Sequence, residues 1–160
     1  MPSTILDQLT PSKLESLLSN PDAEELIVEE ITRTSGRCTI YSPNDSQLPV
    51  HQSKSGERWI FGGKGLGKDT LMCMETIWHA LGNYPDYYPI ECRLKQPSAG
   101  RYCTTNFNDG IKGIVVPELR KWAPPNSFQF KEDDRMIVWR NGSTTQLKSF
   151  AQDIQSFAGQ

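Results

Sequence analysis

The spacing of apolar residues predicts two helices that each bury one face. In both, the apolar side chains follow one another at intervals of three or four residues, which places them on one side of a helix. The first set is Leu71, Met74, Ile77, Trp78 and Leu81, within residues 68–81, and the second is Ile111, Ile114, Val115, Leu119 and Trp122. Gly82-Asn83 predicts the end of the first helix and Pro124-Pro125 the end of the second. Pro117 lacks a backbone N–H, so we expect a kink in the second helix.

Short apolar runs between turn residues predict the strands. The triplet Trp59-Ile60-Phe61 follows a polar loop and predicts a central strand over residues 57–62. The dipeptide Asn141-Gly142 is the type that most strongly favours a tight hairpin turn. Further strands are expected at residues 101–105, at the sheet edge over 127–131, and in a hairpin formed by 135–140 and 144–150.

The first third of the chain predicts helices followed by a polar loop. Residues 1–33 have a helical pattern, with a break at residues 19–22 and a second helix that starts at Pro21 or Asp22. Residues 34–56 are rich in Ser, Gly, Pro and Asn and predict a long loop. Gln47 and His51 are its notable polar residues. Composition favours an exposed position for both, although a long loop directly before a strand also suits a segment that serves a site.

Residues 62–70 have the layout of a phosphate-binding P-loop. Gly62 and the pair Gly67-Lys68 keep the G-x-x-x-x-G-K spacing, and Gly63 and Gly65 lie between them. Glycines allow positive φ, which lets backbone N–H groups approach phosphate oxygens, and the following helix directs its first N–H groups at the same anion. Lys68 would add a positive charge at the outer phosphates. A glycine-rich turn without a ligand is the alternative interpretation.

Asp69 occupies the position at which a P-loop normally has the Ser or Thr that holds Mg²⁺. Its carboxylate oxygen suits Mg²⁺, but without the metal it repels phosphate. Thr70 lies one residue further, about a quarter turn around the helix, and cannot simply substitute. The expected ligands are therefore ATP and Mg²⁺, with Asp69 as the metal ligand.

Composition limits the classes of protein that fit. The chain has 160 residues, a net charge of -2 and a mean hydropathy of -0.54, which fit one soluble domain. No apolar run is long enough to cross a membrane, and no excess of basic residues indicates nucleic acid. The four cysteines are widely spaced without a C-x-x-C pair, so we expect free thiols and a cytoplasmic location rather than a zinc site.

Short sequence motifs between residues 43 and 159 occur in an order and spacing that carry a resemblance to a known family. They are residues 43–47 (PNDSQ), 50–51 (VH), 58–63 (RWIFGG), 80–89 (ALGNYPDYYP), 119–124 (LRKWAP), 137–143 (IVWRNGS), 149–150 (SF) and 157–159 (FAG). In this order and spacing, the chain from about Pro43 resembles the large subunit of viral terminases, the ATP-driven DNA-packaging motors of tailed bacteriophages.

The resemblance implies an α/β fold in which helices flank a P-loop NTPase-like sheet. A helical N-terminal segment, 1–42, would precede the first part of the ATPase domain, 43–160. Gln47 would read adenine, Lys68 would bind phosphate, and Lys64 would replace an arginine that contacts the γ-phosphate. The implied partners are double-stranded DNA, a portal protein and a small terminase subunit. The full-length protein would form a homo-oligomeric ring in the host cytoplasm.

The chain departs from the family after its F-x-G phrase. The family continues with a strand that ends in Asp-Glu, the metal-binding Walker B pair, and no such pair follows residues 157–159. The resemblance thus implies an incomplete domain, without Walker B, coupling motif or nuclease domain. Two other classes remain. One is a non-catalytic nucleotide-binding or assembly protein with a relic P-loop. The other is a nucleoside-monophosphate kinase, although its arginine-rich lid has no counterpart among the scattered late arginines.

We expect no Mg²⁺-dependent ATP hydrolysis above background from the 160-residue chain. The attacking water must be oriented and the metal held opposite the P-loop, usually by an acidic pair at a strand end. Glu132-Asp133-Asp134 comes nearest, but its flanking runs predict a solvated turn between strands. A phosphate-release assay tests this, and steady turnover that disappears in Lys68→Ala would contradict it.

Overall fold

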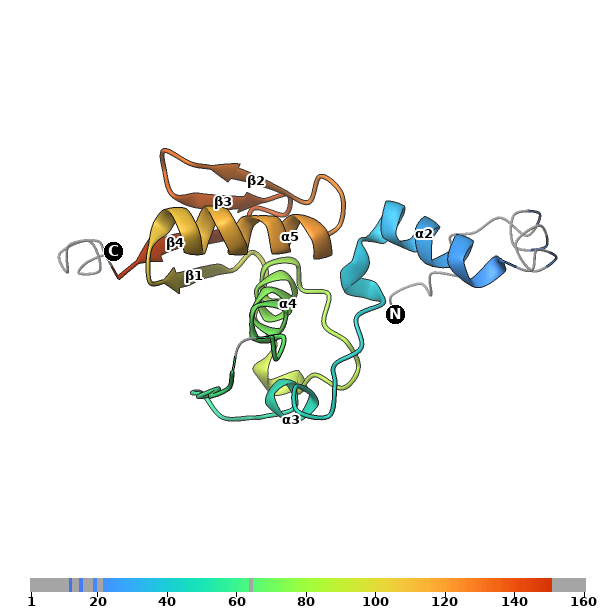
Figure 1. Cartoon of the computed structure of the whole chain (residues 1–160), viewed down its shortest axis with the longest axis horizontal. Coiled ribbons are helices and arrows are strands. Elements are labelled where there is room, and N and C mark those ends of the chain that lie inside the picture. The colour runs from blue at the N-terminus through green and yellow to red at the C-terminus, as the bar shows by residue number, and fades with distance from the viewer. Residues whose placement is uncertain (1–11, 13–14, 16–18, 20–21, 64, 151–160) are drawn as a thin grey trace.

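Four strands form one mixed sheet, and helices pack against one of its faces (Figure 1). A computed structural model describes residues 12, 15, 19, 22–63 and 65–150. The strands are β1 (Ala99–Thr104), β2 (Phe128–Lys131), β3 (Met136–Trp139) and β4 (Thr144–Ser149), in the order β1-β4-β3-β2. β1 runs parallel to β4, whereas β3 is antiparallel to both β4 and β2.

The hairpin and the edge strand form as the sequence predicts. Asn141-Gly142 joins β3 to β4, and β2 lies at the sheet edge. Along β4, Thr145, Leu147 and Ser149 are buried while the alternate residues are half-buried, so one face meets the helices and the other meets solvent. Residues 132–135 form an exposed turn between β2 and β3, which confirms the interpretation of the acidic run there.

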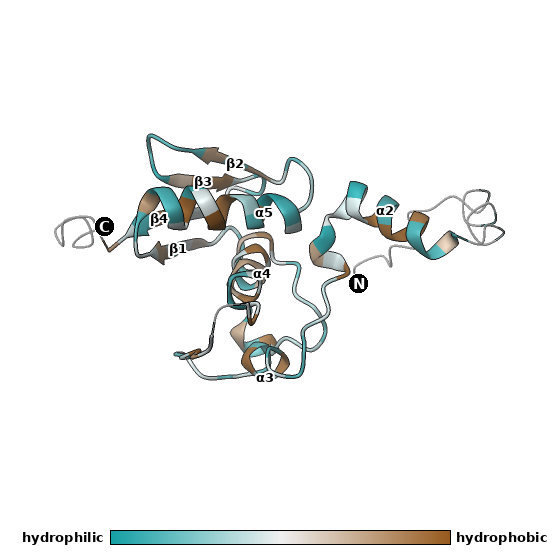
Figure 2. Cartoon of the chain, viewed as in Figure 1, coloured by the Kyte–Doolittle hydropathy of each residue, from teal (hydrophilic) through white to brown (hydrophobic). Residues whose placement is uncertain are grey.

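The helix that follows the glycine-rich loop is α4, Lys68–Leu81, with the predicted bounds. Figure 2 shows hydrophobic residues on α4, on β3 and on the helix α5 (Val116–Trp122). The buried apolar side chains of α4 include most of the predicted stripe: Leu71, Met74, Ile77 and Trp78. Gly82 ends α4 in the left-handed conformation, with φ 77°. The hairpin secures this end, because Asn141 Nδ2 donates to the Ala80 carbonyl at 2.8 Å.

The second predicted helix also forms, but in two parts. Its first part is the π-helix η4, Phe107–Val115, and its second part is α5. The Asn106 side chain accepts from the N–H groups of Asp109 and Gly110 and so caps the start. The change from π- to α-helix falls beside Pro117, which lies in the first turn of α5 and cannot donate a backbone hydrogen bond.

The N-terminal part is helical where it is described. α2, Ala23–Ser35, begins directly after Asp22, as the sequence predicts, and it has no buried residue. It extends away from the sheet and α4 (Figure 1). The helix expected before Ser19 lies largely outside the described residues. The residues that the structure describes also form three short helices: η2 (Arg37–Thr39), α3 (Leu48–His51) and η3 (Ile90–Cys92).

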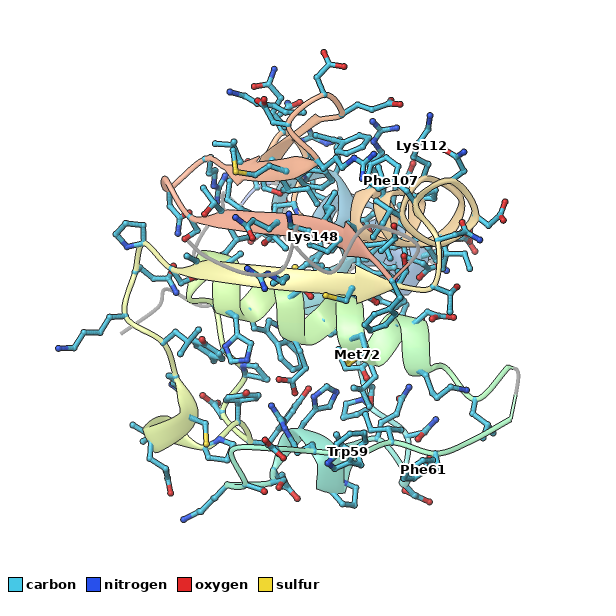
Figure 3. The ribbon with its side chains drawn as sticks, turned by 90° about the vertical axis from the view of Figure 1, so that its left-hand side faces the viewer. Trp59, Phe61, Met72, Phe107, Lys112 and Lys148 are labelled. Carbon is cyan, nitrogen blue, oxygen red and sulfur yellow. The ribbon has the colours of Figure 1, made fainter. Side chains whose placement is uncertain are left out.

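No strand forms at residues 57–62, all of which are described, so the predicted central strand is wrong. The segment keeps the alternation of a strand: Arg58 and Ile60 are half-buried, whereas Trp59 and Phe61 are 79% and 88% exposed. A strand also needs a hydrogen-bonded neighbour. Among the described strands, β1 pairs with β4 alone, and Ile60 and the β1 residues Ala99–Arg101 instead line a common pocket of about 330 Å³. Figure 3 shows Met72 on the side of α4 that faces Trp59 and Phe61.

Two methionines of α4 offer a matched test of this packing. Met74 is 0% exposed and Met72 is 43% exposed. Met74→Ala should lower the free energy of unfolding by about 2–5 kcal/mol, since it leaves a cavity in the core. Met72→Ala should change it by less than about 1 kcal/mol. Urea unfolding measures both, and equal losses would contradict the described orientation of α4.

Candidate functional site

The glycine-rich loop leads directly into α4. Gly65 and Gly67 both have positive φ, 85° and 71°, and Gly67 is the residue that precedes the first turn of the helix. A Cβ atom on Gly67 would lie 2.7 Å from Gln47 Nε2, so conformation and space both require glycine there. Two of the four predicted glycines, Gly65 and Gly67, therefore adopt positive φ.

The Lys68 side chain folds back over the loop. Its ammonium donates to the carbonyl of Gly62 at 2.9 Å and to that of Gly63 at 2.6 Å. Both glycines are exposed, so the ammonium lies at the open side of the loop. A charged amine held by neutral carbonyls keeps an attraction for an anion. This is the position from which Lys68 could contact a phosphate.

The first turn of α4 has no side-chain cap among the described residues, so its first N–H groups have no side-chain acceptor there. Asp69 is exposed in this turn, where a carboxylate interacts favourably with the helix dipole, and Thr70 is half-buried. Asp69 therefore has a structural role without metal, and its predicted role as metal ligand stays a prediction. Lys64 lies outside the described residues.

Gln47 lies against the loop, as the family resemblance implies, although it is 20 positions before Gly67 in the chain. Its Nε2 donates to the Gly67 carbonyl at 3.1 Å. Its Oε1 accepts from the Asn44 N–H at 3.0 Å and from the Tyr41 hydroxyl at 3.2 Å. Gln47 is 7% exposed, so the surface position that composition favours is wrong.

His51 is fully buried, which also contradicts an exposed position in the loop. Its Nδ1 lies 2.6 Å from Glu75 Oε1, and its Nε2 lies 3.1 Å from the Tyr41 hydroxyl. Burial, together with the nearby Tyr87 and Glu75, raises the pKa of Tyr41 to about 12. The Tyr41 hydroxyl therefore keeps its proton and joins His51 to Gln47.

Glu75 is the centre of this buried polar group. Its two carboxylate oxygens accept from the Arg58 guanidinium at 3.2 and 3.1 Å. The Tyr88 hydroxyl donates to Oε2 at 3.0 Å, and His79 Nε2 lies 3.3 Å from the same oxygen. Burial alone would raise the pKa of Glu75. Hydrogen bonds with His51 and His79 and the charge of Arg58 outweigh burial and hold this pKa well below its usual range.

These contacts form one path of side chains from the middle of α4 to the loop. We call the set Gln47, Tyr41, His51, Glu75, Arg58 and Tyr88 the buried polar network. Sequence reasoning missed most of it. One signal was available, because Glu75 lies four residues after Leu71 and three before Trp78, on the buried face of the helix. A carboxylate at such a position requires partners.

The pocket beside Ile60 is a separate feature. Its lining combines apolar side chains, such as Leu71 and Met72, with Arg58, Glu75 and Arg101. None of the described residues of the loop 62–70 lines it. This pocket and the candidate phosphate site therefore share no described residue, and phosphate binding would depend on the geometry of the loop alone.

The described residues contain no helix long and apolar enough to cross a membrane. Within the same residues, no group of three or more His, Cys, Asp or Glu side chains is placed to hold a metal ion. Cys38, Cys73, Cys92 and Cys103 are free thiols. Comparison of the chain with protein-family models, with curated proteins and with solved structures finds no match in any of the three.

Replacement of Glu75 should show what the buried polar network contributes to stability. Glu75→Gln leaves Arg58 without its counter-charge and should lower the free energy of unfolding by about 3–5 kcal/mol near neutral pH. Because the folded-state pKa of Glu75 is lowered, its stabilisation is complete above about pH 4.3, the unfolded value, and is lost as the pH falls below it.

The difference in the free energy of unfolding between wild type and Glu75→Gln should therefore become smaller as the pH is lowered. Urea unfolding at about pH 7 and about pH 3 measures it. Glu25→Gln, at an exposed position of α2, is the control and should show no large effect at either pH. A difference for Glu75→Gln that stays constant across this range would contradict the role of its charge.

Proposed function

We propose that this chain binds the phosphates of a nucleoside triphosphate at the loop 62–70. One observation carries the proposal. The Lys68 ammonium donates to carbonyls of the loop, and the first turn of α4, which directly follows the loop, has no side-chain cap among the described residues. Positive charge and free N–H groups together attract a polyphosphate. Gly65 and Gly67 supply the backbone conformation that brings N–H groups close to it.

We further propose that the chain is the ATP-binding part of a terminase-type packaging ATPase. The support is the order of short phrases from about Pro43 to residue 159, together with the position of Gln47 beside the loop. The mixed α/β sheet with flanking helices suits this class in outline. Against it stands the unpaired segment 57–62, because a P-loop normally follows a central strand. This proposal includes double-stranded DNA, a portal protein and a small terminase subunit as partners, and a homo-oligomeric ring as the assembly.

Mg²⁺ would be held by Asp69 under this proposal. The carboxylate is exposed in the first turn of α4, one residue after Lys68, where it can reach a bound polyphosphate from the helix side. An oxygen ligand suits Mg²⁺, and phosphate oxygens and water would complete its octahedral shell. Chemistry on the phosphates would depend on this ion as a charge-neutralising partner.

The loop lysine offers the direct test. Lys68→Ala should weaken binding of ATP and of inorganic triphosphate by at least about tenfold, since a charged contact to phosphate is lost. The urea midpoint should change little, because the ammonium bonds only to exposed loop carbonyls. Isothermal titration calorimetry with and without Mg²⁺ gives the affinities. Lys95→Ala, an exposed lysine outside the loop, is the matched control.

If Lys68→Ala binds triphosphate as wild type does, the loop has no part in phosphate binding and the proposal fails. If wild type binds ATP only with Mg²⁺ and Asp69→Ala removes that dependence, Asp69 is the metal ligand. Binding that is identical with and without Mg²⁺ in wild type would remove Asp69 from that role.

A further inference from the structure

Gln47 has its amide turned into the protein. Its carbonyl oxygen accepts two hydrogen bonds, from Asn44 N–H and Tyr41 hydroxyl, and its nitrogen donates to Gly67. An amide that reads adenine must present its carbonyl and an N–H side by side to the base. Gln47 is 7% exposed and its oxygen is already used twice, so it is not arranged for that task.

Gln47 contacts the Gly67 carbonyl oxygen, which is also the acceptor of the first hydrogen bond in α4. The Gly67 carbonyl oxygen accepts the first helical hydrogen bond of α4, from Leu71 N–H at 3.0 Å, and also the bond from Gln47 Nε2 at 3.1 Å. The same Gln47 nitrogen would lie 2.7 Å from a Cβ on Gly67, so the two residues are tightly packed. Gln47 therefore fixes the backbone at the point where the loop becomes helix.

A second contact, between His51 and Glu75, also joins α3 to α4. Gln47 immediately precedes α3, and His51 is the last residue of α3. On α4, their partners are Gly67 at the start and Glu75 two turns later. Two separated contacts fix the orientation of α3 against α4, whereas one would allow rotation. The Tyr41 hydroxyl bridges Gln47 and His51 and so couples the two contacts.

We propose that Gln47 is a positioning residue, which holds the loop in its phosphate-binding shape and takes no part in recognition of the base. This inference rests on the proposed binding of a nucleoside triphosphate. It deepens that proposal, because it states that Gln47 contributes to binding of the triphosphate and not to binding of the base. Nucleotides that share a triphosphate but differ in the base should therefore depend on Gln47 equally.

Gln47→Met tests this, since methionine has a similar size but neither the N–H donor nor the carbonyl acceptor of the amide. Isothermal titration calorimetry should show at least about three- to tenfold weaker binding for ATP, GTP and inorganic triphosphate alike, because the bond to the Gly67 carbonyl is lost together with the two bonds that hold the Gln47 amide. Tyr41→Phe, which removes a hydroxyl that does not touch the loop, should weaken all three ligands in the same way but less. Gln52→Ala, an exposed glutamine one residue after α3, should change none of them.

A loss confined to ATP would overturn the inference and make Gln47 a base-reading residue. Unchanged binding of all three ligands in Gln47→Met would also overturn it. A general loss of stability is distinguished by the urea midpoint, and Gln52→Ala shows the effect of losing an amide beside the same helix.

A readout without ligand separates this inference from the proposed function. In the free protein, Gln47→Met should shift the amide resonances of Gly67 and Lys68 and speed hydrogen exchange at Leu71 N–H, whose acceptor is the Gly67 carbonyl. Unchanged resonances and exchange would overturn positioning by Gln47. If wild type binds none of the three ligands, the proposed function alone fails, and the amide readout still decides whether Gln47 positions the loop.

Discussion

The buried carboxylate of Glu75 holds the loop region of this chain to the rest of the fold. It accepts from Arg58 on the segment before the loop, lies 2.6 Å from His51 of α3 and accepts from Tyr88. None of these segments is paired into the sheet, so backbone hydrogen bonds do not fix their positions. A buried charge without partners is costly, and the requirement to surround this carboxylate therefore gathers the segments around α4.

The candidate site follows from this arrangement. Because His51 is fixed on Glu75, the other end of α3 brings Gln47 to the Gly67 carbonyl, and Arg58 directs the segment that continues into the loop. The buried polar network thus reaches the start of α4, beside Lys68, through the bond from Gln47 to the Gly67 carbonyl. Phosphate recognition needs such preorganisation, since backbone N–H groups must converge on one point.

Local signals predicted much of the fold. The helical stripe and Gly82 gave α4 its bounds, and Asn141-Gly142 gave the hairpin, because both depend on neighbours in sequence. The prediction of a strand at residues 57–62 was wrong because a strand depends on a pairing partner elsewhere in the chain. The local alternation of side chains does not reveal whether such a partner exists. The burial of Gln47 and His51 depends on contacts 20 and 24 residues away. Only Glu75, a carboxylate on an apolar face, indicated that buried partners must exist.

The central claim is that polyphosphate binds where the loop meets α4. Titration of the isotopically labelled protein with inorganic triphosphate and Mg²⁺, followed by amide resonances, tests it most directly. The account predicts the largest shifts at Gly65, Gly67, Lys68, Asp69 and Thr70, with the sheet and α5 little changed. Largest shifts at the pocket between α4 and β1, at Thr76 and Gly100, or no shifts at millimolar ligand, would contradict it.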